Sequence, residues 1–520
     1  MRDIQHWQRV CGIEDVLPDT GVCARVAGRQ IALFRVADQL YAIDNRDPFS
    51  GANVLSRGIV GDLRGELVVA SPLYKQHFSL RSGRCIEAPE RSVRAYPVRV
   101  LDGAVWVRPR RSLVVIGNGI AGLRAVEELL EVAPQAYDVT VFGAEPHPGY
   151  NRVLLSPVLA GDATGEELEL HGAEWYAEHG VIVHAADPVV QIDRRRRVVH
   201  SAQGRVIGYD RLLIATGSHP VRLAVPGCDL AGVLTFRNLG DLDAMLAAAH
   251  AGRRAVVIGG GVLGVEAASG LCRRGMQVTL VHRDPLLMGR QLDGAAAEML
   301  RAALEERGIR CRLACTVEAL EGEAESGRRA VRQVRLAGGE RLGADLVVMA
   351  VGIRPNTDLA QRAGLRCERG ILVDDTLQTF DPAIYAVGEC VQHRNSTFGL
   401  VAPLWEQARV CAIHLAEVGV SRYVERVRPV RLRVSGIQLY SAGEIADGPG
   451  REVLVLHDAR RGLYRRVVLE QGRMVGVVLH GDAEDASWYL NWIVSREPVG
   501  AMRDKLLFGA GAAPAVANAR

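Results

Sequence analysis

The sequence predicts a multidomain protein in which an all-β region precedes an α/β region and a small α+β region. Up to residue 108, short alternating apolar runs are separated by turn signals, as in strands with one buried face. From 112 to about 418, apolar strands alternate with helical patterns, which is typical of a parallel sheet covered by helices. Strand patterns return from 428 and precede a helix that carries Trp488 and Trp492.

Length and composition agree with several packed cores. The chain has 520 residues, 48% of them apolar, and about 150 residues per domain predicts three or four domains. A net charge of +3 provides no field that favours nucleic acid or an anionic membrane. No apolar run reaches the roughly 20 residues of a membrane span, and the N-terminus lacks the apolar core of a signal peptide. We therefore expect a cytoplasmic protein that binds neither nucleic acid nor membrane, with its ten cysteines reduced.

The strongest signal in the α/β region is a glycine fingerprint after the apolar strand Leu113–Ile116. The first glycine permits a tight turn, the second lets a pyrophosphate approach the backbone, and the third lets helix and strand pack closely. The helix that follows directs its free N–H groups and positive dipole end at the phosphates. The expected contact residues are Gly117, Asn118, Gly119, Ile120, Ala121 and Gly122.

An acidic residue, Glu145, follows the next strand and is placed to accept a hydrogen bond from a ribose hydroxyl. It lies 28 residues after Gly117, a longer offset than the usual value of about 20.

The fingerprint occurs a second time after Ala255–Ile258, and its expected contact residues are Gly259, Gly261, Leu263, Gly264 and Glu266. Two copies, each between an apolar strand and a helix, predict two bound dinucleotides, one a flavin and the other a nicotinamide coenzyme.

A basic pair, His282 and Arg283, stands at the end of the next strand, where NAD-selective sites usually carry an acid. The pair could hold the 2′-phosphate of NADPH. Alternatively, His282 caps the strand and Arg283 is solvated. The sequence leaves the choice between NADH and NADPH open.

Four further segments resemble, in the same order, motifs of the disulfide-reductase-like flavoproteins with two dinucleotide domains: Leu212–Ser218, Ala350–Thr357, Thr379–Glu389 and Gly399–Pro403. The resemblance implies an FAD-binding domain at 112–245 and 355–418 and an NAD(P)-binding domain at 246–354. It also implies cofactor contacts at Thr216, Gly217, Gly352, Gly388, Glu389 and Ala402.

A narrower resemblance is to the flavin module of the assimilatory NAD(P)H nitrite reductase large subunit, carried by Gly149–Ser156, Leu287–Asp293 and Met502–Gly509. It implies that Arg152 lies near the flavin and that 428–508 forms a C-terminal α+β interface domain. The sequence ends before that family's cluster and siroheme segments, so we expect it not to reduce nitrite alone. Pro157 stands where related oxidases carry a reactive cysteine, which argues against a thiol mechanism.

Residues 1–108 resemble the nitrite reductase small subunit, which has a Rieske-type fold. A Rieske centre needs C-x-H and C-x-x-H on two facing loops. The corresponding segments here read Asn45-Arg46-Asp47 and Ser71-Pro72-Leu73-Tyr74, so all four ligands are missing. We expect no cluster or other metal and a docking or structural role for this domain.

Together these resemblances imply an FAD-dependent NAD(P)H oxidoreductase that passes electrons to a separate redox partner protein. The flavin carries the chemistry, so no side chain needs to act as acid, base or nucleophile. The expected partner is the catalytic subunit of a nitrite or nitrate reductase, and a homodimer is compatible with the sequence. Two alternatives stay open: a reductase of a ferredoxin- or rubredoxin-type carrier, and a non-catalytic scaffold stabilised by flavin.

Overall fold

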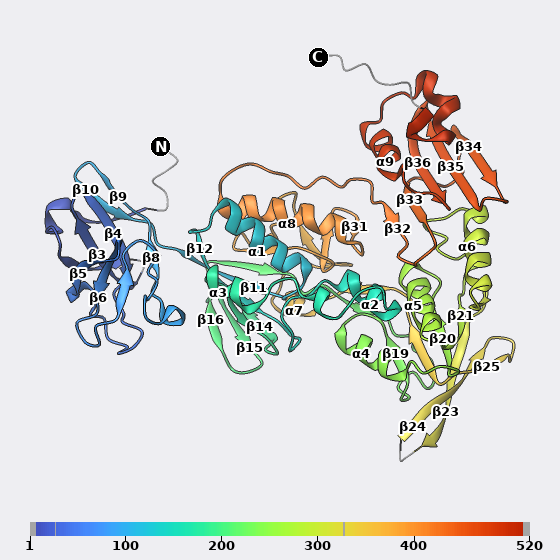
Figure 1. Cartoon of the computed structure of the whole chain (residues 1–520), viewed down its shortest axis with the longest axis horizontal. Coiled ribbons are helices and arrows are strands. Elements are labelled where there is room, and N and C mark those ends of the chain that lie inside the picture. Colours follow the sequence, from blue (N-terminus) through green and yellow to red (C-terminus); the bar gives the residue numbers. More distant parts are fainter. Residues whose placement is uncertain (1–6, 27, 326–327, 513–520) are drawn as a thin grey trace.

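The computed structural model describes residues 7–26, 28–325 and 328–512, which form an all-β region, a central α/β region and a C-terminal region in an extended row (Figure 1). In these described residues, no helix is both long and apolar enough to cross a membrane.

The N-terminal region consists of antiparallel sheets around two small cores. In strand β3 (Arg29–Val36), Ile31 and Leu33 face one core, and Ala32 and Phe34 face the other. A strand that is apolar on both faces therefore joins the two halves of the region. The sheets are β1-β10-β9 (Gln8–Gly12, Ala104–Val107, Val98–Leu101), β2-β3-β4-β8 (Gly21–Val26, Arg29–Val36, Gln39–Asp44, Ala95–Tyr96) and β5-β6-β7 (Ile59–Leu63, Glu66–Ala70, His77–Ser79).

The first parallel sheet has the order β13-β12-β11-β17-β29 (Ile182–His184, Tyr137–Phe142, Arg111–Ile116, Arg211–Ile214, Ile384–Ala386). Helices α1 (Ile120–Val132) and α8 (Val401–Ala416) pack against each other, and both contribute to the core of this sheet. Because the strands are parallel, their carboxyl ends share one edge. The turns at Gly117, Glu145, Thr216 and Gly388 all follow strands of this sheet and therefore meet at that edge.

The second parallel sheet repeats this plan, with the order β22-β21-β20-β26-β19 (Arg310–Arg312, Gln277–Val281, Arg254–Ile258, Leu346–Met349, Val233–Thr235). Its helices are α4 (Leu239–Ala248), α5 (Val262–Arg273) and α6 (Gly294–Glu306). The fingerprint strand is central in both sheets, and the next two strands of the chain lie on the same side of it. The two connections between the α/β halves run side by side as the antiparallel pair β18 (Ser218–Pro220) and β27 (Ile353–Pro355).

Smaller elements decorate these two sheets. The remaining helices of the α/β region are α2 (Leu155–Ala160), α3 (Ala173–Glu178) and α7 (Asp358–Arg362). The small sheets are β14-β15-β16 (Val189–Asp193, Val198–Ser201, Val206–Gly208), β23-β24-β25 (Val317–Glu325, Arg328–Leu336, Arg341–Gly343) and β28-β30-β31 (Ile371–Val373, Val391–His393, Ser396–Thr397).

The C-terminal region is an antiparallel sheet of order β32-β33-β36-β35-β34 (Val430–Arg431, Leu439–Gly443, Arg473–His480, Leu463–Glu470, Arg451–Asp458). Helix α9 (Ala486–Ser495) packs on one face, where Trp488 and Trp492 are partly buried with ring centroids 6.1 Å apart. The other face shares a core with the second parallel sheet, to which Tyr464 and Val478 contribute.

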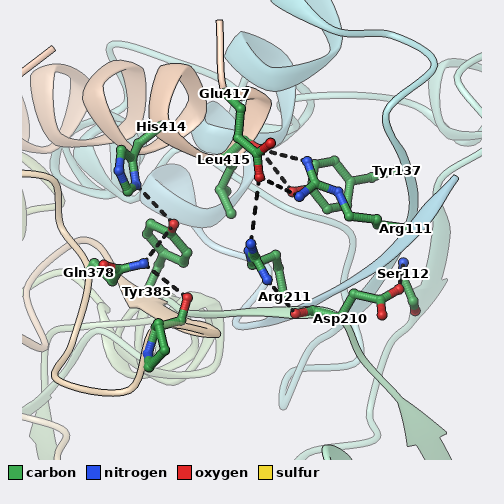
Figure 2. Close-up of polar contacts among 11 residues, drawn as sticks. Arg111, Ser112, Tyr137, Asp210, Arg211, Gln378, Tyr385, His414, Leu415 and Glu417 are labelled. Carbon is green, nitrogen blue, oxygen red and sulfur yellow. Dashed lines mark hydrogen bonds and ion pairs between the residues drawn. The ribbon is translucent and has the colours of Figure 1, made fainter. Parts of the chain in front are cut away.

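The chain passes directly from the N-terminal region to the first parallel sheet, because β10 ends at Val107 and β11 begins at Arg111. Figure 2 shows Arg111, the first residue of β11, reaching Glu417 at 2.5 Å just beyond the end of α8. Asp138, near the start of β12, binds Arg29 at 3.1 Å and Arg94 at 3.2 Å, both from the N-terminal region. The N-terminal region therefore sits at the amino edge of this sheet, opposite the edge that carries the fingerprint turn.

Candidate functional site

One cavity of about 1590 Å³ is lined by the turns of both parallel sheets. Single small-molecule sites usually occupy roughly 300–1,000 Å³, so the volume suits two dinucleotides better than one. Apart from two glycines, every residue predicted from the sequence lines this cavity: Gly117, Asn118, Gly119, Ile120, Ala121, Glu145, Arg152, Thr216, Gly217, Gly259, Gly261, Leu263, Glu266, His282, Arg283, Gly352, Gly388, Glu389 and Ala402. The two exceptions, Gly122 and Gly264, lie behind it, where helix and strand pack.

The first fingerprint has the geometry that a bound pyrophosphate requires. Gly117 has a φ of +118°, and a Cβ there would lie 2.1 Å from the carbonyl oxygen of Ala215. A Cβ on Gly122 would lie 2.4 Å from the carbonyl oxygen of Gly117. At Gly119, by contrast, a Cβ would meet nothing within 4 Å, which leaves an open cradle at the N-terminus of α1. The residues present therefore fit the phosphates of a dinucleotide.

The second fingerprint reproduces this geometry almost atom for atom. Gly259 has a φ of +119°, and its Cβ would lie 2.3 Å from the carbonyl oxygen of Ala350. A Cβ on Gly264 would lie 1.8 Å from the carbonyl oxygen of Gly259, whereas Gly261 again faces open space at the start of α5. The cavity thus holds two equivalent phosphate cradles, one from each sheet.

The acid of the first half, Glu145, is held by two neighbours that also line the cavity. It accepts a hydrogen bond from the Tyr150 hydroxyl at 2.7 Å and forms an ion pair with Arg152. Burial is the main cause that raises the pKa of Tyr150, so its hydroxyl stays a donor at neutral pH. Arg152 therefore lies beside the expected ribose subsite.

The second acid, Glu389, is shared between the two halves of the α/β region. Its carboxylate accepts a hydrogen bond from Ser218 at 2.7 Å and pairs with Arg237. Arg237 lies in the loop between β19 and α4, so an ion pair connects the second half to the flavin motif. Sequence reasoning missed Arg237 because that loop carries no recognisable spacing.

The two basic residues after β21, His282 and Arg283, have different surroundings. The Nδ1 atom of His282 accepts a hydrogen bond from the N–H of Gly260 at 3.1 Å, which ties the strand end to the fingerprint. Burial lowers the pKa of His282, so the neutral imidazole suits this acceptor role. The Arg283 side chain is 77% exposed at the cavity wall, and Arg290 of the same β21–α6 connection also lines the cavity. A phosphate on the coenzyme ribose would therefore meet the two arginines rather than His282.

Thiol chemistry has little support in the geometry. Of the ten cysteines, all within the described residues, Cys315 is the one that lines the cavity. Burial raises the pKa of Cys311 and Cys367 to about 11, so both stay protonated at neutral pH.

The two loops that would hold a Rieske centre are bound to each other instead. The buried carboxylate of Asp47 accepts a hydrogen bond from the Ser71 hydroxyl at 2.7 Å, and Asn45 accepts one from the N–H of Ser56. Burial works to raise the pKa of Asp47, but its hydrogen bonds together hold it below the ordinary value. Tyr74, at the fourth position, is 60% exposed.

These side chains supply neither the two thiolates nor the two imidazoles of a [2Fe–2S] centre, so they do not fit it. Throughout the described part of the chain, no three His, Cys, Asp or Glu side chains cluster in a way that could hold a metal ion.

Three family models match consecutive parts of the chain. The model described as pyridine nucleotide-disulphide oxidoreductase matches residues 111–412. A Rieske-like [2Fe-2S] domain model matches residues 6–108, and a rubredoxin NAD+ reductase C-terminal domain model matches 429–497. These matches confirm the order of regions expected from the sequence.

Relatives and solved structures point to the same class of protein. The chain is 43% identical over 378 residues to a nitrite reductase [NAD(P)H] of Bacillus subtilis, covering 73% of this chain and 46% of that protein. It is 37% identical to the assimilatory nitrate reductase electron transfer subunit of the same organism, covering 76% and 51%. The chain thus spans about half the length of these relatives. The structure of a covalent putidaredoxin reductase–putidaredoxin complex aligns with a TM-score of 0.70 at 27% identity, covering 77% of this chain and 96% of that one.

Proposed function

The chain belongs to the pyridine nucleotide-disulphide oxidoreductase family, and we propose that it oxidises NAD(P)H through FAD and passes the electrons to a separate acceptor protein. The observation that carries this proposal is the single cavity into which two equivalent phosphate cradles open. A protein that uses one dinucleotide needs one such cradle, whereas a flavoprotein reductase needs its two cofactors in contact.

The proposed division of labour follows the two sheets, except that β19 and most of α4, which belong to the second sheet, lie before residue 246. The part at 112–245 and 355–418 binds FAD, with the pyrophosphate at Gly119, Glu145 on the ribose and Glu389 near the ribitol. The part at 246–354 binds NAD(P)H at Gly261. When bound, FAD supplies the redox chemistry by accepting a hydride from the reduced nicotinamide. The chain's own residues bind and orient the two cofactors and keep water from the space between them.

For the choice of coenzyme, we propose NADPH, because Arg283 and Arg290, which both follow β21, line the cavity. Arg283 is exposed, although Asp284 lies 3.5 Å from it, and Arg290 lies on the same β21–α6 connection. A 2′-phosphate would receive charge-assisted hydrogen bonds from both guanidinium groups.

For the acceptor, we propose the catalytic subunit of a nitrite or nitrate reductase in the cytoplasm. This proposal is supported by sequence identity to two relatives that are named as a nitrite reductase and as a nitrate reductase electron transfer subunit. The N-terminal region would hold no cluster and would serve as a docking module, and the assembly would be a homodimer or a monomer within that complex. A ferredoxin- or rubredoxin-type acceptor is the second candidate, favoured by the match of residues 429–497 and by the putidaredoxin reductase alignment.

An anaerobic titration tests the central proposal. The purified protein should show flavin absorption near one FAD per chain, no stoichiometric iron, and bleaching on addition of NADPH or NADH. Reoxidation should then follow on addition of a nitrite or nitrate reductase catalytic subunit. Flavin that neither nicotinamide reduces would overturn the proposal and would favour the scaffold alternative.

A further inference from the structure

The C-terminal region reaches into the cavity, although most of its sheet packs elsewhere. Pro429, Val430, Arg431 and Arg433 all line the cavity wall. They belong to the short segment that enters the C-terminal sheet, which Figure 1 places beside α5. The segment is held in place because Leu432 and Val434 are 4% and 7% exposed in the core shared with the second parallel sheet.

This segment makes one specific contact with the coenzyme half. The backbone N–H of Arg433 donates a hydrogen bond to the Glu266 carboxylate at 3.0 Å. Glu266 lies in the first turns of α5, directly after the second fingerprint, and is 7% exposed in the cavity wall. The two residues are 167 positions apart in the chain, so the contact depends on the docking of the C-terminal region.

The Arg433 N–H and the Ser156 hydroxyl are both donors to the Glu266 carboxyl. Burial is the main cause that raises its pKa, while the Ser156 hydroxyl, the Arg433 N–H and the positive charge of Arg433 act in the opposite direction. A buried carboxyl that loses a hydrogen-bond donor pays a desolvation penalty and turns toward another partner. The Arg433 N–H and the Ser156 hydroxyl therefore orient the Glu266 carboxyl together.

The helix that carries Glu266 is closely packed against α2. Helix α5 is fixed to α2 by the Arg274 guanidinium, which donates to the carbonyl oxygens of Leu159 at 2.9 Å and Val158 at 3.0 Å. A Cβ on Gly270 of α5 would lie only 2.8 Å from the Leu159 side chain, which shows how closely the two helices approach. With both helices fixed, the orientation of Glu266 is set by its own hydrogen bonds.

We propose that the C-terminal region is part of the nicotinamide-coenzyme site and that Arg433 is a positioning residue, whose backbone N–H holds Glu266 toward the nicotinamide end of the coenzyme. The ligand class is a pyridine dinucleotide, whose carboxamide N–H₂ group is the donor that a fixed carboxylate accepts. The inference rests on the proposed function and adds to it a third region of the chain.

The test compares two substitutions at one position. Arg433→Pro removes the N–H and Arg433→Ala keeps it, so the difference between them isolates the backbone donor. In the FAD-loaded protein, calorimetry with NADP+ should give a dissociation constant about tenfold larger for Arg433→Pro than for Arg433→Ala, as expected for one hydrogen bond to a buried charged group. FAD content and the unfolding temperature of both variants verify that the fold is retained.

A double-mutant cycle adds a readout that a general structural defect would not reproduce. If Arg433 acts through Glu266, then Arg433→Pro should weaken NADP+ binding no further once Glu266→Ala is present. Additive losses in the double variant would refute the proposal, as would equal dissociation constants for the proline and alanine variants.

Hydrogen exchange keeps the proposal testable if the proline variant does not fold. In the native holoprotein, NADP+ should slow exchange in the peptide that contains Arg433, and Glu266→Ala should speed it. Unchanged exchange in both experiments would overturn the inference alone. Absence of any NADP+ or NAD+ binding to the native protein would instead defeat the proposed function.

Discussion

Alanine substitutions at Gly119 and Gly122 of the first fingerprint should affect different properties: the first FAD binding, the second folding stability. Gly119 has φ −104° and ψ −178°, an extended conformation that any L-residue adopts, and a Cβ there would meet no protein atom within 4 Å. Nothing in the protein itself requires glycine at that position. We therefore expect Gly119→Ala to fold like the native chain, because the new methyl group projects only into the space proposed for the FAD pyrophosphate.

The expected loss is in FAD binding. A methyl group in the cradle would separate the pyrophosphate from the N–H groups at the start of α1, and the loss of one or two charge-assisted hydrogen bonds costs about 3 kcal/mol. That energy corresponds to about a 100-fold larger FAD dissociation constant. Reconstitution of apoprotein with FAD, followed by flavin fluorescence, measures this constant directly.

Gly122→Ala is the matched control, because its Cβ would lie 2.4 Å from the carbonyl oxygen of Gly117. This overlap with backbone should cost about 1–3 kcal/mol of folding free energy and should lower the unfolding temperature of the apoprotein. If Gly119→Ala binds FAD as tightly as the native protein, the assignment of this turn to the flavin is wrong.

The other predictions concern the second cradle and the N-terminal region. Gly261→Ala should weaken NADPH binding by about 100-fold without changing FAD content, measured by calorimetry. Combined alanine substitution of Arg283 and Arg290 should raise the KM for NADPH at least about tenfold and leave that for NADH nearly constant; equal effects would argue against the 2′-phosphate site. Asp47→Ala should lower the unfolding free energy by about 3 kcal/mol and Ser71→Ala by about 1 kcal/mol. Since the hydrogen bonds of Asp47 depress its folded pKa, its stabilisation exists above the unfolded value of 3.8 and disappears as the pH falls through the folded pKa. Acid unfolding curves of the native and Asp47→Ala proteins should therefore converge at low pH.

The family, the order of regions and the use of flavin and nicotinamide were predictable because they depend on backbone geometry. At Gly117 and Gly259, a positive φ and a carbonyl oxygen within 2.3 Å of the missing Cβ leave glycine as the residue that fits. Such positions keep the same spacing wherever the turn occurs. The sequence therefore reports them directly.

Contacts between distant segments could not be predicted in the same way. Arg237 and Glu389 are 152 positions apart, and no local pattern marks either as the partner of the other. His282 shows a related limit, because its residue type suited a phosphate as well as it suited the N–H of Gly260. Only the packing of the fingerprint turn against the strand end decides between these two partners. The proposed preference for NADPH therefore depends on Arg283 and its surroundings.

The attachment of the N-terminal region through Asp138 limits where an acceptor could bind under the proposed function. The strands of the first parallel sheet that separate Asp138 from the fingerprint edge are six residues long, which corresponds to roughly 20 Å. A partner that contacted only the N-terminal region, blue in Figure 1, would be separated by the buried core of this sheet from the proposed FAD site. The proposed electron transfer would then need a large acceptor protein. Such an acceptor would contact the N-terminal region at the amino edge of the sheet and place its redox centre at the opposite edge, beside the fingerprint turn.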